Sequence, residues 1–338
     1  MRDFLSTHLK KWWRLIVPIA FIALAIWRFD LRVVAVKLVE SDLHLVVIAW
    51  TVGFGTMVVL WSWRWQLLLK SYDVHYSLAR AVELYLIGMF AGFFFSNSLG
   101  AFVRGLYVKE DGYHVGEAMM TVLLDKALEI VSLLVFGMLG LVVFPSLFSR
   151  RWVVWTVLAG CVCGGGGIIW TLKGTMGRWV SKKLDILLSR RLPHTEASSF
   201  SRLYRGLRAI TIWTWIQTSL ISLAGRLMHY TSVYVLARAL GIPLSFVSTV
   251  AVMSLVGIVV ALPISLAGGL GTRDAALVGL FAFLGQSSEA ALSLSFLILV
   301  CSLGWMVIGM ALWLRHPLQW SDERVDIRSK SADVKHIE

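Results

Sequence analysis

Residues 289–314 read EAALSLSFLILVCSLGWMVIGMALWL, and their only charged side chain is the first, Glu289. At about 1.5 Å per residue, a helix over this stretch is long enough to cross the roughly 30 Å hydrocarbon core of a bilayer. Comparable apolar runs recur through the chain. We expect spanning helices at 13–29, 43–63, 80–95, 117–143, 152–172, 212–237, 245–262 and 289–314. The predicted fold class is therefore an all-α, polytopic membrane protein with about eight transmembrane helices.

The composition of the whole chain excludes an ordinary soluble protein. Of its 338 residues, 58% are hydrophobic and 15% are charged, and the mean hydropathy is +0.75. A soluble domain is about half apolar and about a quarter charged. The net charge of +12 fits loops that face anionic lipid, so no nucleic-acid partner is expected. Cys161, Cys163 and Cys301 lie inside apolar segments, and neither a disulfide framework nor a metal site is expected.

Four basic or polar regions bear on the topology. The N-terminus has basic residues ahead of its apolar run but no small-residue cleavage site, so we expect a retained first helix. The others are the 64–80 loop, the stretch 173–211 with nine basic residues, and the polar tail 315–338. The positive-inside rule favours the cytoplasmic side for all four. We expect the 173–211 stretch to lie on the membrane surface.

Eight plain crossings conflict with that rule, because they put 173–211 on the opposite side from both chain ends. Two further apolar stretches, 96–108 and 263–285, are short and broken by glycine. The first is only about 20 Å long as a helix. We expect two broken or re-entrant elements here, and the sequence leaves open whether each crosses the membrane or turns back.

The two broken elements resemble each other. Residues 98–100 (SLG) lead to Arg104, and residues 265–268 (SLAG) lead to Arg273. A Glu-Ala pair and a long apolar helix follow each element. Paired broken segments at matching positions are the best sequence pointer to the central site of a transporter.

We therefore divide a single transmembrane domain, 1–338, into two pseudo-repeats. The first covers about 13–143 and the second about 152–314. If each half crosses the membrane an odd number of times, the second half is inverted relative to the first.

Two groups of polar residues lie inside the predicted spans. Asp125, Lys126 and Glu129 lie in the helix 117–143, where Lys126 and Glu129 can pair at a spacing of three. Arg226 and His229 lie in the middle of the helix 212–237. Ionisable groups at this depth face a cavity or a partner, because isolated charges are costly there. The first group is either a substrate site or a self-neutralising cluster that locks packing. Arg226 needs an anion, which is Asp125, Glu129 or a bound phosphate, whereas a histidine such as His229 is more typically a packed residue.

The stretch from Pro263 to Asp274 has the features of an anion site. Its glycines let the backbone approach a ligand, and a helix beginning near Thr272 would direct free N–H groups at an anion. The alternative is a tight turn without a ligand. The residues predicted at the substrate site of the whole chain are Arg104, Asp125, Lys126, Glu129, Arg226, His229, Ser265, Gly268, Gly269, Gly271, Arg273 and Asp274.

Patterns typical of catalysis are missing from the sequence. It contains no HExxH, no GxSxG and no P-loop. We expect no enzymatic activity and no cofactor. An intramembrane transferase that uses Asp125 or His229 remains an alternative.

The sequence ALPISLAGGLGTRDAAL at 261–277 is close to the pattern L-P-I-S-x-G-G-x-G-x-R-E, with one added residue before the glycine pair and Asp274 in place of Glu. On this motif the chain, over about 10–315, resembles the flippase-like transmembrane region of lysylphosphatidylglycerol synthases and their stand-alone relatives. Arg64-Trp65 near the end of the second helix and Asp125-Lys126, where Glu-Arg is usual, also match. The first broken element departs from the family, because the usual Gly-Gly-Asp before the arginine is Ala101-Phe102-Val103 here.

The resemblance implies a lipid flippase of a prokaryotic cytoplasmic membrane. Full synthases carry an aminoacyltransferase domain after the membrane part, and we expect this chain to represent the translocation part alone. The implied substrate is a phospholipid, aminoacyl-lipid or polyprenyl or glycolipid whose phosphate contacts Arg104, Arg226 and Arg273. Asp125 and Glu129 would balance these charges or accept a cationic headgroup. The alternative is a non-transporting scaffold, and a second copy or an envelope-biosynthesis enzyme is a possible partner.

Overall fold

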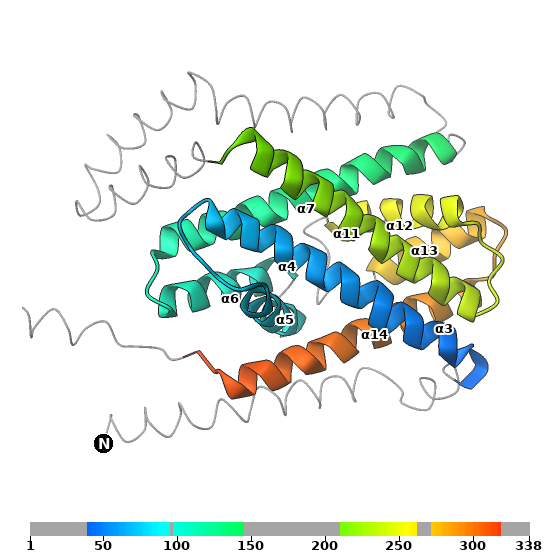
Figure 1. Cartoon of the computed structure of the whole chain (residues 1–338). Coiled ribbons are helices and arrows are strands. Elements are labelled where there is room, and N and C mark those ends of the chain that lie inside the picture. Colours follow the sequence, from blue (N-terminus) through cyan, green and yellow to red (C-terminus); the bar gives the residue numbers. More distant parts are fainter. Residues whose placement is uncertain (1–38, 95–96, 145–209, 262–271, 319–338) are drawn as a thin grey trace, which may run out of the picture.

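The computed structural model describes residues 39–94, 97–144, 210–261 and 272–318, and every regular element in these ranges is a helix (Figure 1). The first helix is continuous over Leu43–Lys70 and contains a π-helical turn. Its parts are α3 (Leu43–Ile48), η1 (Ala49–Phe54) and α4 (Gly55–Lys70). The others are α5 (Leu78–Phe94), α6 (Asn97–Glu110), α7 (Val115–Val143), α11 (Ile212–Ala239), α12 (Phe246–Ala261), α13 (Thr272–Phe283) and α14 (Ser288–Arg315).

Local sequence sets where several of these helices begin and end. Asp42 Oδ1 accepts the backbone N–H groups of His44 and Leu45, which are unpaired at the start of α3. Thr211 and Ser287 cap α11 and α14 in the same way. Beyond the C-termini of α11 and α13, Gly241 and Gly285 adopt φ values of +67° and +69°, which other residues rarely tolerate.

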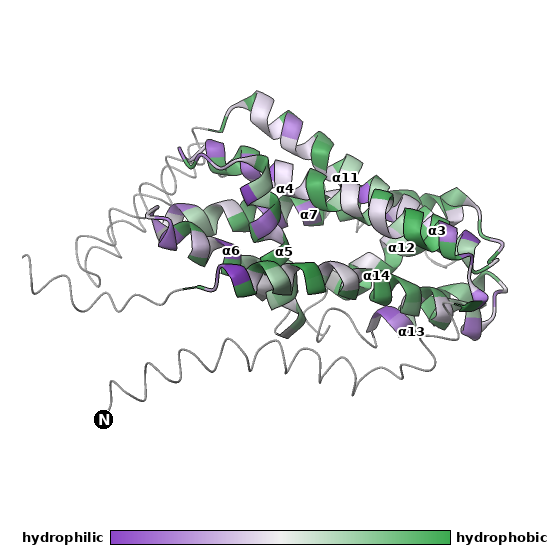
Figure 2. Cartoon of the chain, turned by 60° about the horizontal axis from the view of Figure 1, so that its bottom comes forward, coloured by the Kyte–Doolittle hydropathy of each residue, from purple (hydrophilic) through white to green (hydrophobic). Residues whose placement is uncertain are grey.

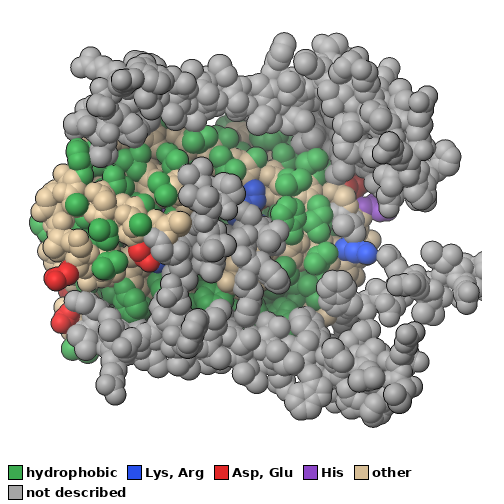
Figure 3. All heavy atoms as spheres, turned by 180° about the vertical axis from the view of Figure 1, so that it is seen from behind, with side chains coloured by type: hydrophobic (Ala, Val, Ile, Leu, Met, Phe, Trp, Pro, Cys, Tyr) green, Lys and Arg blue, Asp and Glu red, His purple; other side chains and the backbone are tan. Residues whose placement is uncertain are grey.

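Two of the described helices, Leu43–Lys70 and Ser288–Arg315, are long and apolar enough to cross a membrane by length and composition. Large hydrophobic side chains are also exposed along α7 and α11, among them Ile130, Val131 and Leu220. Figure 2 shows that the middle of α14 is hydrophobic whereas its end and the end of α6 carry hydrophilic residues. On the face seen in Figure 3, hydrophobic side chains far outnumber charged ones among the described residues.

The helices α5 and α6 form a hairpin that opens at the end of the molecule where α4 ends and α7 begins. Arg80, in the first turn of α5, forms an ion pair of 3.4 Å with Asp111, just after α6. The hydroxyl of Tyr76 also donates to Asp111, over 2.6 Å. Burial and this contact raise the pKa of Tyr76, so the hydroxyl remains a donor. The element expected at 96–108 is therefore a continuous helix from Asn97. It brings the chain back to the end of the molecule where α5 begins.

The helices α12 and α13 form the equivalent hairpin at the opposite end. Phe283, at the end of α13, packs on Phe144 at the end of α7, with ring centroids 6.2 Å apart. Phe246, at the start of α12, packs on Tyr234 near the end of α11. The element expected at 263–285 is described from residue 272, and there it is helical.

These hairpins bear on the predicted topology. The segments 80–95 and 245–262, expected to cross the membrane, are arms of hairpins whose outer ends lie at the same end of the molecule. The helices that run from end to end within the described ranges are Leu43–Lys70, α7, α11 and α14. The predicted count of about eight crossings is thus not confirmed. The predicted helices 13–29 and 152–172, the stretch 173–209 and the tail from 319 lie outside the described residues.

The packing order follows a repeated scheme. Helix α4 crosses α11, while α7 packs on α12 and α14 packs on α5. Each hairpin also packs on the long helix that follows it, α6 on α7 and α13 on α14. Figure 1 shows that α4 and α11 run in opposite directions, as do α7 and α14. Helices α6 and α13 are not among the main helix contacts of the described residues.

Candidate functional site

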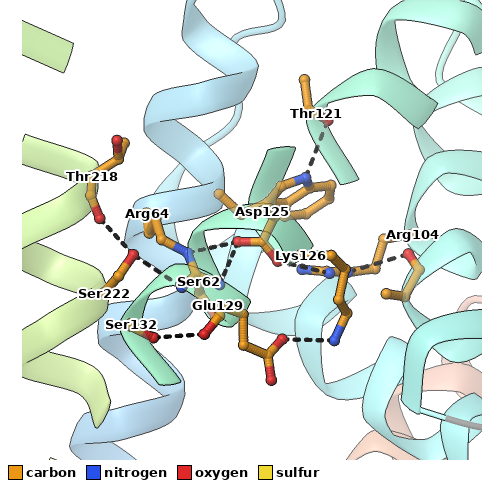
Figure 4. Close-up of polar contacts among 12 residues, drawn as sticks. Ser62, Arg64, Arg104, Thr121, Asp125, Lys126, Glu129, Ser132, Thr218 and Ser222 are labelled. Atoms are coloured by element: carbon orange, nitrogen blue, oxygen red, sulfur yellow. Dashed lines mark hydrogen bonds and ion pairs between the residues drawn. The ribbon is translucent and has the colours of Figure 1, made fainter. Parts of the chain in front are cut away.

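A fully buried carboxylate, Asp125 on α7, lies between two arginines (Figure 4). Arg64 on α4 donates from Nε to Asp125 Oδ1 over 2.7 Å, and its Nη2 lies 2.6 Å from the same oxygen. Arg104 on α6 donates from Nη2 to Oδ2 over 3.0 Å. One acidic side chain therefore joins three helices, and both of its oxygens are occupied by guanidinium groups.

A second set of bonds fixes the guanidinium of Arg64. Its Nη1 donates to Ser222 Oγ on α11 over 3.1 Å, and Ser222 in turn donates to the backbone carbonyl of Thr218 over 2.6 Å. Charge-assisted bonds of this kind hold a guanidinium in one orientation. The role of Arg64 is therefore to position Asp125 and to tie α4 to α7 and α11.

Arg104 is held mainly by aromatic faces. Its guanidinium carbon lies 4.8 Å from the ring centroid of Trp65 and 4.5 Å from that of Tyr85, both within cation–π range. Trp65 is itself fixed by a bond from Nε1 to Thr121 Oγ1 over 3.2 Å. Arg104 is only 2% exposed, yet its Nη1 has no hydrogen-bond partner. That nitrogen is available to an acceptor.

One turn along α7 lies a second group of charges. Lys126 and Glu129 form an ion pair of 2.8 Å, as their spacing predicted. Arg226 on α11 donates from Nη2 to the backbone carbonyl of Glu129 over 3.1 Å and lies 3.7 Å from its carboxylate. The guanidinium of Arg226 lies 5.4 Å from the ring of Trp61, and its Nε has no hydrogen-bond partner. We call the set of charged residues around this helix the α7 charge cluster. Its members are Arg64, Arg104, Asp125, Lys126, Glu129 and Arg226.

His229 continues this group along α11. Its ring meets the edge of Phe54 in η1, with centroids 5.6 Å apart, and its Nδ1 is buried without a hydrogen-bond partner. The charged groups close enough to act on this ring are Arg226, Arg273 and Glu129. His229 therefore lies between the α7 charge cluster and the start of α13.

Arg273 and Asp274 are placed by α14. Arg273 donates from Nε to Ser295 Oγ over 2.9 Å and from Nη2 to the carbonyl of the same residue over 3.1 Å. The Ser295 hydroxyl donates to Asp274, whose carboxylate lies 3.7 Å from Arg273 Nε. Arg273 and Asp274 therefore form a local pair that Ser295 ties to α14. Ser265, Gly268, Gly269 and Gly271 lie outside the described residues, so the predicted glycine cradle stays a prediction.

Sequence reasoning found most of this cluster but missed Arg64. The residues at 125, 126, 129 and 226 were singled out because they are charged inside apolar helices, and the structure brings them together. Arg64 was expected in the 64–80 loop and was noted for its resemblance to a family pattern, although it lies buried in α4 and is the closest partner of Asp125. Arg64 could have been singled out in the same way, because it is a charged residue near the end of a long apolar run. Within the described ranges, His, Cys, Asp and Glu side chains form no group suited to hold a metal ion.

Comparison with known proteins agrees with the membrane architecture. The sequence profile described as "Lysylphosphatidylglycerol synthase TM region" matches residues 12–310. A "UPF0104 membrane protein" of Pyrococcus horikoshii is 21% identical over 150 residues, which cover 42% of this chain and 43% of the relative. The alignment thus spans less than half of that relative's length, and no solved structure matches the chain. Because the profile spans most of the sequence, the chain belongs to the family of lysylphosphatidylglycerol synthase transmembrane regions, and it is a membrane protein.

Proposed function

We propose that this protein is a lipid flippase or transporter, which moves a polar, phosphate-bearing lipid across the cytoplasmic membrane of a prokaryote. The observation that carries the proposal is the α7 charge cluster. Its arginines are buried among apolar helices and keep donors without acceptors, at Arg104 Nη1 and Arg226 Nε. Ionisable groups inside a membrane are expensive and mark substrate pathways by default. The family supports a role connected with lipids more generally.

The topology we propose has six crossings and two re-entrant hairpins. The crossings are 13–29, Leu43–Lys70, α7, 152–172, α11 and α14, and the hairpins are α5–α6 and α12–α13. This arrangement puts the N-terminus, the end of α4 with the loop to α5, the 173–211 stretch and the tail on one side, so the conflict between charge and crossing number disappears. That side would be the cytoplasm, and the two hairpins would enter from opposite faces of the membrane.

An inverted repeat in this topology is supported by pairs of close helix contacts. Gly53 of η1 meets Ser232 of α11, and Gly225 of α11 meets Trp61 of α4. Gly137 of α7 likewise meets Ile258 of α12, while Gly309 of α14 meets Leu86 of α5. In both cases the equivalent glycines are 172 residues apart, 53 with 225 and 137 with 309. A two-fold axis in the membrane plane relates such repeats in many transporters, whose substrates bind near the midplane.

In the proposed mechanism the phosphate headgroup passes between the hairpins while the tails stay in the bilayer. Arg104 and Arg226 would bind phosphate oxygens through the nitrogens that have no partner, and Arg273 would contribute from the second hairpin. An arginine suits this role because its planar fork of donors matches phosphate. Asp125 would act as a positioning residue, since both of its oxygens are already bound by Arg64 and Arg104. Lys126, Glu129 and His229 would line the same path.

The test is translocation by the purified full chain in vesicles. Fluorescent short-chain lipids are incorporated, and a membrane-impermeant quencher reports the fraction in the outer leaflet over time. Labelled lipid in the inner leaflet is protected from the quencher. Transport is supported if this protection is lost only when the protein is present. A scaffold would bind a lipid or an envelope enzyme without moving any lipid, and an intramembrane transferase would change the lipid's mass. If folded protein binds a lipid without moving it, or changes the mass of the lipid, the flippase proposal is wrong.

A further inference from the structure

The α7 charge cluster is not electrically balanced. Its basic members outnumber its acidic ones by four to two, so two positive charges are left without a carboxylate within the described part of the chain. The basic members are Arg64, Arg104, Lys126 and Arg226, and the acidic ones are Asp125 and Glu129. Arg273 does not change this balance, because it is paired with Asp274.

The excess charge coincides with the donors that lack acceptors. Arg104 is 2% exposed and Arg226 is 8% exposed, and each has one guanidinium nitrogen without a partner. A buried donor that is left unpaired loses its bond to water without replacement. His229, one turn from Arg226 on α11, adds a buried ring nitrogen without a hydrogen-bond partner. The excess positive charge and the donors without acceptors therefore both indicate that this site binds an anion with several oxygens.

The side chain next to Arg104 in α6 adds no acid to the cluster. Val103 precedes Arg104 and packs against the group of buried side chains that includes Trp65. An acid at that position would reduce the excess from two charges to one. The full excess therefore stays beside the aromatic faces of Trp65 and Tyr85, where water does not screen it.

We infer that the lipid recognised here ends in a phosphate with two negative charges, as in a lipid phosphomonoester or diphosphate, and that zwitterionic and singly charged phosphodiester headgroups are disfavoured. The inference rests on the proposed function. Two negative charges on the lipid neutralise the cluster. A neutral protein–lipid complex costs less to bury within the hydrocarbon core than a charged one. A terminal phosphate also offers three acceptor oxygens and carries a charge of about −1.5 to −2 at pH 7.

Binding of headgroups separates these alternatives directly. The purified full chain in detergent is titrated with three lipids that share one acyl composition: phosphatidic acid, phosphatidylglycerol and phosphatidylethanolamine. Tryptophan fluorescence is the readout, because Trp61 and Trp65 lie against the arginines of the cluster. The phosphomonoester should bind on the order of tenfold more tightly than the singly charged diester, and the zwitterion should bind least. Equal affinity for all three lipids would overturn the inference.

Val103 provides a matched pair of variants. Val103→Asp adds an acid next to Arg104, and Val103→Asn has nearly the same shape as the aspartate without its charge. The aspartate should reduce the preference for phosphatidic acid over phosphatidylglycerol by on the order of tenfold, whereas the asparagine should retain it. Melting temperatures of both variants confirm folding. Equal preferences in the two variants would show that charge balance does not set selectivity.

Translocation of the same three lipids distinguishes a failure of this inference from a failure of the proposed function. If phosphatidic acid binds best but the protein moves none of the lipids, the headgroup inference stands and the flippase proposal fails. If all three lipids are moved at the same rate, the flippase proposal stands and the headgroup inference fails.

Discussion

Substitution of Asp125 by asparagine isolates the charge at the centre of the cluster, because the two side chains have almost the same shape. The carboxylate is fully buried, and it is the acidic partner of both Arg64 and Arg104. Removing one partner of a buried pair costs about 3–5 kcal/mol, because the other charge stays buried and uncompensated. At about 2 °C per kcal/mol for a chain of this size, the melting temperature should fall by about 6–10 °C.

The contrasting variant is Arg104→Gln. It removes the ion pair of Arg104 with Asp125 and the cation–π contacts with Trp65 and Tyr85, but Asp125 stays paired with Arg64, so its cost should be smaller than that of Asp125→Asn. The double variant should be more stable than Asp125→Asn alone, because one uncompensated arginine has been removed. Thermal unfolding of the purified protein in one detergent measures all three variants. The reasoning would be refuted if Asp125→Asn melted like the wild type, or if the two losses simply added in the double variant.

Three further predictions follow from other parts of the structure. In a background without native cysteines, His114→Cys should react with an impermeant reagent only from the cytoplasmic side. Pro243→Cys should react only from outside. A topology of eight plain crossings predicts the reverse side for both residues. Arg273→Lys should reduce lipid translocation, and Arg273→Ala should reduce it more, because lysine cannot make both bonds to α14; full translocation by a stable alanine variant would remove this residue from the headgroup path. Trp50→Phe and Trp305→Phe should each cost about 0.5–1.5 kcal/mol in thermal unfolding, since each indole donates to a carbonyl on the other's helix, and unchanged melting would show that these bonds contribute nothing net.

Hydrophobic pattern predicted where helices form, but not which of them reach the opposite end. The segment Leu78–Phe94 is as apolar as a spanning helix, and its expected bounds, 80–95, were close to those of α5. Its return at the same end depends on contacts with α6, such as Arg80 with Asp111, that no local pattern reveals. Glycine suggested a broken element at 96–108, whereas the glycines of α5 and α6 serve the close approach of two intact helices.

Contacts of the candidate site between residues close in sequence could be predicted. Contacts between residues on different helices could not. Lys126 and Glu129 pair within one turn, so their sequence spacing was enough to predict the contact. The partners of Asp125 come from α4 and α6, which are distant in sequence, and only the packing of three helices shows that both are arginines. Burial of Arg64 was equally invisible, because an arginine near a helix end is ordinarily expected to reach the membrane surface.

The proposed inverted repeat also indicates that the fold does not require the charges of Arg64 and Asp125. With a spacing of 172 residues, the positions equivalent to Arg64 and Asp125 are Leu236 and Leu297, and all four side chains are fully buried. The second half thus fills the same places with leucine and packs just as closely. Apolar replacement of a buried ion pair is often neutral or stabilising, so stability gives no reason to keep the charged version. We therefore propose that Arg64 and Asp125 are kept because they position Arg104 for the headgroup that the proposed flippase binds.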